Sequence, residues 1–144
     1  MSRAELLAPA GDIDAAWAAF HYGADAVYLG LPQFSARAEA TNVTPGQLEE
    51  IVAWAHAAQP RRAVFLAVNT LLLNRELGDM VRTLGLAGDV GVDALIVQDL
   101  GVARLARRCA PGIALHASTQ MAIHNLEGAR ALKRLGFSRV TLAR

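Results

Sequence analysis

Three stretches of sequence share one pattern and decide the fold class: Gly23-Ala-Asp-Ala-Val27, Gly91-Val-Asp-Ala-Leu95 and Gly136-Phe-Ser-Arg-Val140. In each stretch a glycine ends a helical segment, and a polar residue then leads into an apolar run. Glycine is the usual residue at the left-handed position that ends a helix. The pattern therefore predicts repeated helix-to-strand junctions, with roughly 30 residues in each strand–helix unit.

The segments around these junctions predict a strict alternation of strands and helices. Short apolar runs with little polar alternation are typical of strands that are covered on both faces of a parallel sheet. The expected strands are Glu5–Ala8, Ala26–Gly30, Ala63–Val68, Ala94–Val97, Ala114–Ala117 and Arg139–Leu142.

The intervening segments carry helix signals. Thr44, Pro45 and Gln47 form an N-cap, a proline at the first helical position and a capping-box glutamine. The helical segments are expected over Ile13–Tyr22, from Thr44 to about Ala58, after an N-cap at Asn74, over Leu100–Cys109, and over Leu126–Leu135 after an N-cap at Asn125. Gly78, Gly85 and Gly88 weaken the prediction for the helix after Asn74.

Strict alternation is compatible with a doubly wound sheet or with a β/α barrel. The turn Pro9-Ala10-Gly11-Asp12 lacks the Gly-x-Gly-x-x-Gly fingerprint of a dinucleotide-binding fold. A TIM-type barrel needs eight units in about 250 residues. We therefore expect residues 1–144 to form the N-terminal part of an α/β, parallel (β/α) barrel of TIM type, with five units and a sixth strand. The remainder of the barrel is expected to be absent, as in a truncated or fragmentary product.

Composition narrows the class of protein. The chain has 53% hydrophobic and 19% charged residues, which is typical of a globular domain. Its net charge of +1 produces no overall field that favours nucleic acid or a membrane surface, although a local basic patch would suffice for RNA. The chain has no signal-peptide pattern and no apolar run long enough to cross a bilayer, so we expect a cytoplasmic protein without membrane contact.

The single cysteine, Cys109, cannot complete a cysteine-based metal or iron–sulfur site, so no metal is expected in this chain. Cys109 follows Arg107 and Arg108, whose charges could lower its pKa, but a half-buried structural thiol is the preferred interpretation. His116 and His124 lack the helical His-Glu-x-x-His spacing of a zinc site.

In parallel β/α folds the reactive residues gather at the carboxyl ends of the strands. These positions supply polar candidates, namely Asp12, Arg37, Asn69, Gln98, Asp99, His116, Ser118, Gln120 and Arg144. Simpler roles stay open for several of them, because Asp12 and Asp99 could cap helices. Asn69 could stabilise a turn, and Arg37 could be a solvated loop charge.

His116, Ser118 and Gln120 give the strongest local signal. Alternation with Ala117 and Thr119 would place an imidazole, a hydroxyl and an amide on one face of an extended segment. A hydrolytic His116–Ser118 pair is disfavoured, since side chains two residues apart are displaced along a strand. The chain also lacks a Gly-x-Ser-x-Gly nucleophile elbow.

Seven ordered blocks resemble the N-terminal region of the collagenase-like peptidase family, peptidase family U32. They are Glu5-Leu-Leu-Ala-Pro-Ala-Gly-Asp12, Gly23-Ala-Asp-Ala-Val-Tyr-Leu-Gly30, Phe34-Ser-Ala-Arg-Ala38, Asn69-Thr70, Gly91-Val-Asp-Ala-Leu-Ile-Val-Gln-Asp99, Leu115-His-Ala-Ser-Thr-Gln120 and Val140-Thr-Leu-Ala-Arg144. The resemblance implies a β/α barrel and covers nearly the whole chain.

The resemblance also implies function. The family is named for proteolysis, with collagen as a substrate of some members. Better-understood members resemble oxygen-independent hydroxylation factors that act on a transfer-RNA uridine, a ribosomal-RNA cytidine or a ubiquinone precursor. Such members use an iron–sulfur cluster held by four cysteines, and the RNA-directed ones need prephenate. The blocks at Phe34, Gln98 and His116 are most similar to the ribosomal-RNA branch.

Site residues carry over only from the matching blocks. The resemblance carries over ten residues without settling their individual roles. Our hypothesis is that His116, Ser118, Gln120 and Asp99 are catalytic, and that Asp12, Tyr28, Arg37, Asn69, Gln98 and Arg144 bind substrate. Arg37 and Arg144 would hold an anionic group, and His116 would handle a proton. Because the cluster cysteines lie outside the matched region, the chain alone is expected to bind no cluster and to be inactive as a hydroxylase.

Four functions remain open. The first is the barrel portion of an RNA-base hydroxylation enzyme with ribosomal or transfer RNA as its partner. The others are a collagenase-like peptidase, a ubiquinone-precursor hydroxylation factor, and a non-catalytic fragment that forms homo-oligomers through open barrel edges.

Overall fold

A computed structural model describes residues 4–36, 38–39 and 41–144. Strands and helices alternate along these residues. In chain order the elements are β1 (Leu7–Pro9), α1 (Ile13–His21), β2 (Ala26–Gly30), α2 (Pro45–Ala57), β3 (Ala63–Val68), η1 (Asn74–Glu76), α3 (Leu77–Val90), β4 (Ala94–Val97), α4 (Leu100–Cys109), β5 (Ala114–Ala117), η2 (Thr119–Met121), α5 (Leu126–Arg134) and β6 (Arg139–Val140). None of the helices in this part of the chain has the length and apolar character needed to cross a membrane.

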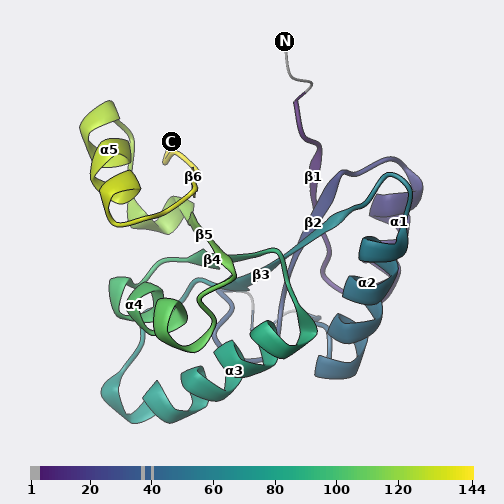
Figure 1. Ribbon diagram of the computed structural model, residues 1–144, viewed down its shortest axis with the longest axis horizontal. Coiled ribbons are helices and arrows are strands. Elements are labelled where there is room, and N and C mark those ends of the chain that lie inside the picture. The colour runs from purple at the N-terminus through teal and green to yellow at the C-terminus, as the bar shows by residue number, and fades with distance from the viewer. Residues whose placement is uncertain (1–3, 37, 40) are drawn as a thin grey trace.

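The strands form one parallel sheet in the order β1-β2-β3-β4-β5-β6, so each strand pairs with the next one in the chain. A doubly wound sheet would reverse its strand order partway along, whereas a barrel keeps chain order. The sheet is curled, and the helices lie along its outer side (Figure 1). The expected incomplete parallel β/α barrel is therefore confirmed as a curled half-barrel.

The two faces of the sheet have different partners. Val27, Leu66 and Leu95 point outward into the main apolar core beneath the helices. Their neighbours along the strands form a smaller inner cluster, which includes Phe65 and Ala94. Because both faces are covered by apolar side chains, the strands lack the polar alternation of a half-exposed sheet.

Several helix starts follow the sequence signals closely. The Thr44 hydroxyl accepts a hydrogen bond from Gln47 N at 3.2 Å, and Thr44 N donates to Gln47 Oε1 at 2.9 Å. This reciprocal pair is the capping box expected for α2. Asn125 caps α5 as expected, since its Oδ1 accepts from Gly128 N at 2.9 Å.

The start of the third helix differs from the prediction. Asn74 begins the 3₁₀ turn η1, and α3 starts only at Leu77 after the N-cap residue Glu76, which forms no side-chain cap. The glycines nevertheless lie inside α3, because its buried face, with Met80 and Leu84, packs into the main core. Packing outweighs the roughly 1 kcal/mol that a helical glycine costs.

Three further predictions need correction. The first strand is Leu7–Pro9 rather than Glu5–Ala8. The sixth strand ends at Val140, short of the expected Leu142. Cys109 is exposed rather than half-buried, because it occupies the last position of α4 on the outer surface.

The repeated junctions have a common physical basis. Gly23, Gly91 and Gly136 have φ values of 95°, 82° and 83°, the left-handed conformation predicted for them. The polar residue two positions later binds the backbone of the preceding strand segment. Asp25 Oδ2 accepts from Leu6 N at 2.8 Å, Asp93 Oδ2 accepts from Val64 N at 2.8 Å, and the Ser138 hydroxyl donates to Leu115 O at 3.2 Å. The repeat thus fastens neighbouring units at the amino end of the sheet.

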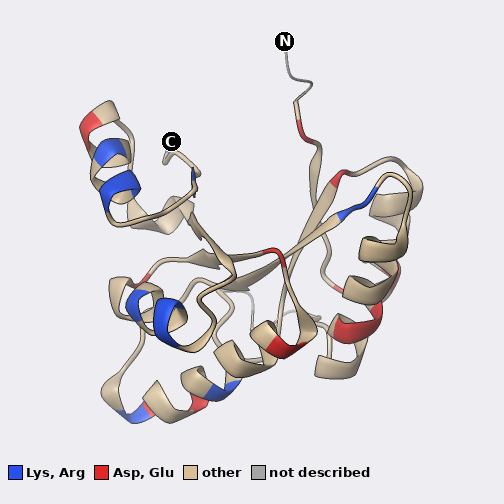
Figure 2. Ribbon diagram, viewed as in Figure 1, with Lys and Arg blue, Asp and Glu red and all other residues tan. Residues whose placement is uncertain are grey.

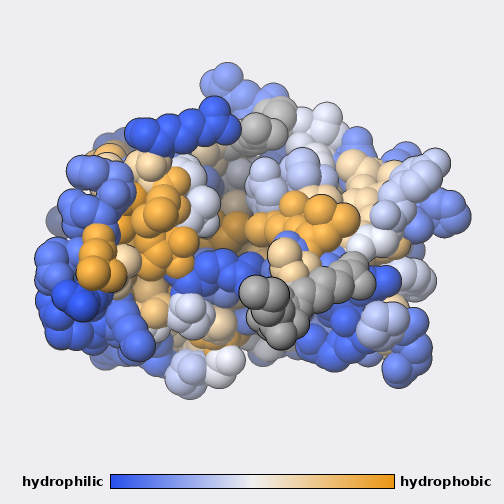
Figure 3. Space-filling model, turned by 90° about the horizontal axis from the view of Figure 1, so that it is seen from above, coloured by the Kyte–Doolittle hydropathy of each residue, from blue (hydrophilic) through white to orange (hydrophobic). Residues whose placement is uncertain are grey.

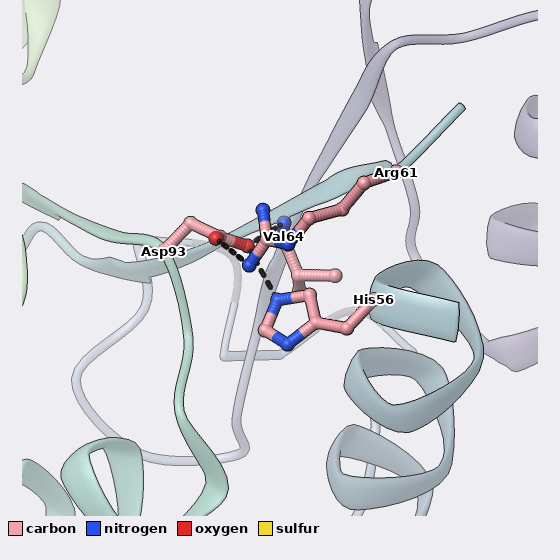
Figure 4. Close-up of polar contacts among 4 residues, drawn as sticks. All are labelled: His56, Arg61, Val64 and Asp93. Carbon is pink, nitrogen blue, oxygen red and sulfur yellow. Dashed lines mark hydrogen bonds and ion pairs between the residues drawn. The ribbon is translucent and has the colours of Figure 1, made fainter. Parts of the chain in front are cut away.

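Asp93 forms the most extensive of these junctions (Figure 4). Besides Val64 N, its carboxylate contacts His56 Nε2 at 3.0 Å and accepts a hydrogen bond from Arg61 Nη2 at 2.7 Å. Partial burial alone would raise the pKa of Asp93, but the hydrogen bonds from His56, Val64 N and Arg61 outweigh burial and hold that pKa below 3.8. Asp93 therefore joins α2, β3 and the start of β4 through a charged carboxylate.

Replacing Asp93 by asparagine should destabilise the fold by about 2 kcal/mol, because the charge-assisted bonds to Arg61 and His56 are lost. Urea unfolding followed by circular dichroism measures the change, with the exposed Asp89→Asn on α3 as the matched control. The lowered pKa of Asp93 means that its stabilisation is present above pH 3.8 and is lost as the pH falls through the folded-state pKa. Equal stability of the two variants at pH 7 would contradict the role of Asp93.

Candidate functional site at the carboxyl end of the half-barrel

A cavity of about 500 Å³ opens at the carboxyl end of the curled sheet. We call it the mouth. Its lining comes from residues at and after the ends of the strands, including Tyr28, Asn69, Ser118, Thr119 and Gln120. The lining side chains that the structure describes, the Tyr28 phenol among them, are uncharged polar or apolar groups. The mouth therefore offers hydrogen-bonding amides and hydroxyls beside an aromatic ring.

The structure brings four of the predicted residues together in the mouth. Tyr28, Asn69, Ser118 and Gln120 all line it. Asn69 Oδ1 also accepts a hydrogen bond from Ala36 N at 3.1 Å, which ties the end of β3 to the loop after β2. Asn69 therefore lines the cavity and also holds the loop after β2 in place. Its hydrogen bond joins two loops and does not stabilise the turn of its own that the alternative interpretation expected.

The extended segment expected through Gln120 is wrong. Strand β5 ends at Ala117, and Thr119–Met121 form the turn η2 with Ser118 as its N-cap. Ser118 Oγ accepts from Gln120 N at 3.3 Å and lies 3.4 Å from Gln120 Oε1. Ser118 and Gln120 therefore meet through a local turn, because a serine that can bond the backbone ahead of it favours a turn over a continued strand.

Two predicted residues act as helix caps outside the lining. Asp12 Oδ1 accepts from Ala15 N at 2.7 Å at the start of α1. Asp99 Oδ1 accepts from Gly101 N at 2.6 Å and from Val102 N at 3.2 Å, while its Oδ2 accepts from Leu72 N at 3.1 Å. The capping alternative is confirmed for both, and Asp99 additionally holds the loop after β3.

The remaining candidates are not gathered at the mouth. Gln98 and Arg144 lie outside the lining, and Arg144 is exposed. Arg37 lies outside the described residues, although its neighbour Ala36 lines the mouth. Where Arg37 and Arg144 meet an anion therefore stays a prediction.

His116 lies on the inner face of β5 next to Ile96, which lines the mouth, but His116 itself is not part of the lining. It is 7% exposed, and its ring meets the Phe65 ring edge-on at 4.7 Å between centroids. Arg139, the partner of His116 in the strand register, lies over the same Phe65 ring at 5.3 Å and forms a two-bond ion pair with Glu5 at 2.8 and 3.0 Å. Glu5, which precedes β1, and Arg139 in β6 thus connect the first and the last strand of the sheet across its concave side.

This environment fixes the protonation state of His116. Burial and the positive charge of Arg139 together lower the His116 pKa to about 4, while Glu5 opposes them. At neutral pH the imidazole is uncharged, so it can accept or donate a hydrogen bond but is a weak base. A role for His116 in proton transfer stays a prediction.

The sequence indicated a loop with polar residues after Gly30, but it did not indicate that this loop packs on Gly30 and closes one side of the mouth. This loop packs directly on Gly30, where a Cβ atom would lie 2.7 Å from Ser35 Cβ and 3.1 Å from Asn42 Oδ1. Thr41 and Asn42 from the same loop line the mouth. Only the glycine at the strand end could have signalled this close approach.

The His116 pKa can be measured by NMR titration and should lie near 4. Arg139→Met should raise it, because removing the positive charge favours the imidazolium form, whereas Arg134→Met on exposed α5 should leave it unchanged. Since the folded-state pKa lies below the ordinary 6.5, stability should fall as the pH drops from 6.5 through about 4. An ordinary value near 6.5 in the unsubstituted chain would contradict this environment.

The chain is similar to known proteins over nearly its whole length. The family model described as Peptidase family U32 matches residues 11–144. The chain is 43% identical over 142 residues to the 23S rRNA 5-hydroxycytidine synthase of Escherichia coli (strain K12), covering 99% of this chain and 21% of that protein. It is 34% identical over 140 residues to tRNA hydroxylation protein P1 of Bacillus subtilis (strain 168), covering 97% of this chain and 33% of that protein.

Other matches bear on the name and on the fold. A collagenase of Porphyromonas gingivalis is 30% identical over 131 residues, covering 90% of this chain and 31% of that protein. The solved structure of a U32 peptidase superimposes with a TM-score of 0.74 at 16% identity, covering 99% of this chain and 59% of that one. The chain thus spans between about a fifth and a third of the length of these curated relatives.

Proposed function

The chain belongs to peptidase family U32, and we propose that it is the base-binding half-barrel of a protein that hydroxylates an RNA base. The base would be a cytidine of ribosomal RNA or a uridine of transfer RNA. The names of the Escherichia coli and Bacillus subtilis relatives support an RNA substrate. Such a protein would work in the cytoplasm, where these RNAs reside.

The observation that carries this proposal is the mouth, whose described lining has polar and apolar side chains and no charged one. An enzyme that modifies a base must take it out of the stack and hold it by its edge and its ring face. Asn69, Gln120 and Ser118 supply amide and hydroxyl groups for the edge, and Tyr28 supplies a ring. The cavity volume of about 500 Å³ lies within the range of small-ligand pockets.

The chain's own residues do not fit an iron–sulfur cluster. Such a cluster needs thiolates from four cysteines, and the chain has only Cys109, which is exposed at the end of α4 on the outer surface. Prephenate is a dicarboxylate that would require cationic partners. We assign this role to Arg37, which follows the mouth residue Ala36 in the sequence, and to Arg144.

The peptidase alternative finds less support. Hydrolysis of a peptide bond by a side-chain nucleophile needs a base within hydrogen-bond reach and a group that orients the base. The mouth has hydroxyls, but among the described residues its lining contains no histidine, aspartate, glutamate or cysteine. Ser118 contacts Gln120 rather than a base.

Self-association is a second property that a specific observation favours. Within the part of the chain that the structure describes, β1 and β6 each pair with a single strand, and Leu6 and Leu142 beside them are 52% and 56% exposed. Figure 3 shows patches of apolar side chains on the face seen from above. Open strand edges beside apolar surface favour pairing with a second copy.

Mass spectrometry of digested ribosomal and transfer RNA, from a strain that lacks the gene encoding this chain, tests the proposed function. A hydroxyl group should be missing from one cytidine or uridine, and the gene supplied on a plasmid should restore it. RNA identical in mass to that of the parent strain would contradict the proposal and favour the peptidase or quinone-precursor reaction.

A further inference from the structure

The charges of the chain are divided sharply along its sequence. Residues 1–99 contain six Arg and Lys residues against twelve Asp and Glu, whereas residues 100–144 contain eight against one. The overall net charge of +1 conceals this division. An asymmetry of this kind between two parts of a chain is typical of proteins that bind a polyanion.

The fold collects the basic part on two neighbouring helices. Arg104 and Arg108 on α4, together with Lys133 and Arg134 on α5, are exposed. We call these four residues the α4–α5 basic face. Figure 2 shows the blue segments on α4 and α5, while red segments dominate on α2.

Arg107 connects α4 to the end of α5. Its guanidinium donates a hydrogen bond to the carbonyl of Leu135, which ends α5. The same guanidinium lies against Gly136, where a Cβ atom would collide with it. Because the Arg107 guanidinium is held in this contact, Arg107 is not counted in the basic face.

The basic face has little internal neutralisation. Within residues 4–36, 38–39 and 41–144, no carboxylate lies within ion-pair distance of any of its four members. The acidic residue of this region, Glu127, pairs with Arg130 at 2.6 Å. Basic side chains in the last turn of a helix do stabilise its dipole, and that accounts for part of the pattern. It does not explain Arg104, which precedes the last turn, or the scarcity of acidic residues over 100–144.

We propose that the α4–α5 basic face binds the phosphate backbone of the RNA whose base enters the mouth. This inference rests on the proposed function and adds the docking surface to it. α4 begins directly after Asp99, at the carboxyl end of β4 where the mouth opens, and runs toward the amino end of the sheet, so Arg104 and Arg108 lie about 6 and 12 Å along the helix from that start. Lys133 and Arg134 lie in the last turn of α5, close to the Gly136 junction at the amino end. An RNA that follows the outer flank over this length can contact the basic face with its phosphates and still present a base to the mouth, since the attraction for phosphate lies outside the described lining of the cavity.

Fluorescence anisotropy with a labelled transfer RNA, measured on the 144-residue chain over a series of salt concentrations, tests the basic face. Arg104→Gln with Arg108→Gln, and separately Lys133→Gln with Arg134→Gln, should each weaken binding about tenfold or more in 0.1 M salt. Each pair should also lower the slope of log K against log salt by about 1.5, because two phosphate contacts are lost.

The matched control is Arg75→Gln with Arg82→Gln, which removes two exposed positive charges from η1 and α3, outside the basic face. It should change affinity less than twofold. Equal weakening by control and basic-face pairs would overturn the inference, because net charge alone would then explain binding. Binding to anionic lipid vesicles but not to transfer RNA would overturn it as well.

The outcome is separable from that of the proposed function. If the basic-face variants bind RNA normally while deletion of the gene removes an RNA hydroxyl, the docking surface is refuted and the function stands. If the variants lose RNA binding while deletion leaves all RNA masses unchanged, the docking surface stands and the hydroxylation proposal fails. Circular dichroism of each variant, identical to that of the unsubstituted chain, shows that any loss is not due to unfolding.

Discussion

The pairing of each strand with the next one in the chain is the constraint on which the rest of the structure depends. Parallel strands joined in this way place all their carboxyl ends at one edge, so the loops that follow them converge there. The same pairing places the amino ends at the opposite edge, where Asp25, Asp93 and Ser138 bind the neighbouring backbone. The amino edge thereby holds neighbouring strands together, and the carboxyl edge carries the mouth.

The order of the strands and helices, and most of their ends, could be predicted from the sequence, because they depend on local sequence patterns. The glycine junctions, the capping box at Thr44 and the apolar strands depend on neighbours in the chain. Which strand-end residues line the mouth could not be predicted fully. Asp99 is a cap because its carboxylate reaches Gly101 N, and Gln120 reaches the mouth through a turn that period-two alternation conceals.

Charge is arranged differently inside and outside the half-barrel. On the inner face, Arg139 is paired with Glu5, and His116 is kept neutral by burial and by Arg139. The described lining of the mouth has amides, hydroxyls and apolar groups but no charged side chain, whereas the basic face on α4 and α5 has no ion-pair partner among the described residues. Such a cavity, together with a basic outer flank, suits a ligand that is itself divided into an uncharged base and a charged backbone.

The most direct test of the base-binding mouth is complementation of the deletion strain by the complete gene carrying Gln120→Ala. Gln120 lines the mouth, whereas the exposed Gln59 precedes β3 at the other edge of the sheet, so Gln59→Ala is the matched control. Mass spectrometry of the RNA should show that Gln120→Ala restores less than about a tenth of the hydroxyl that Gln59→Ala restores, as expected when a buried hydrogen bond to a base is lost. Full restoration by Gln120→Ala would contradict the account.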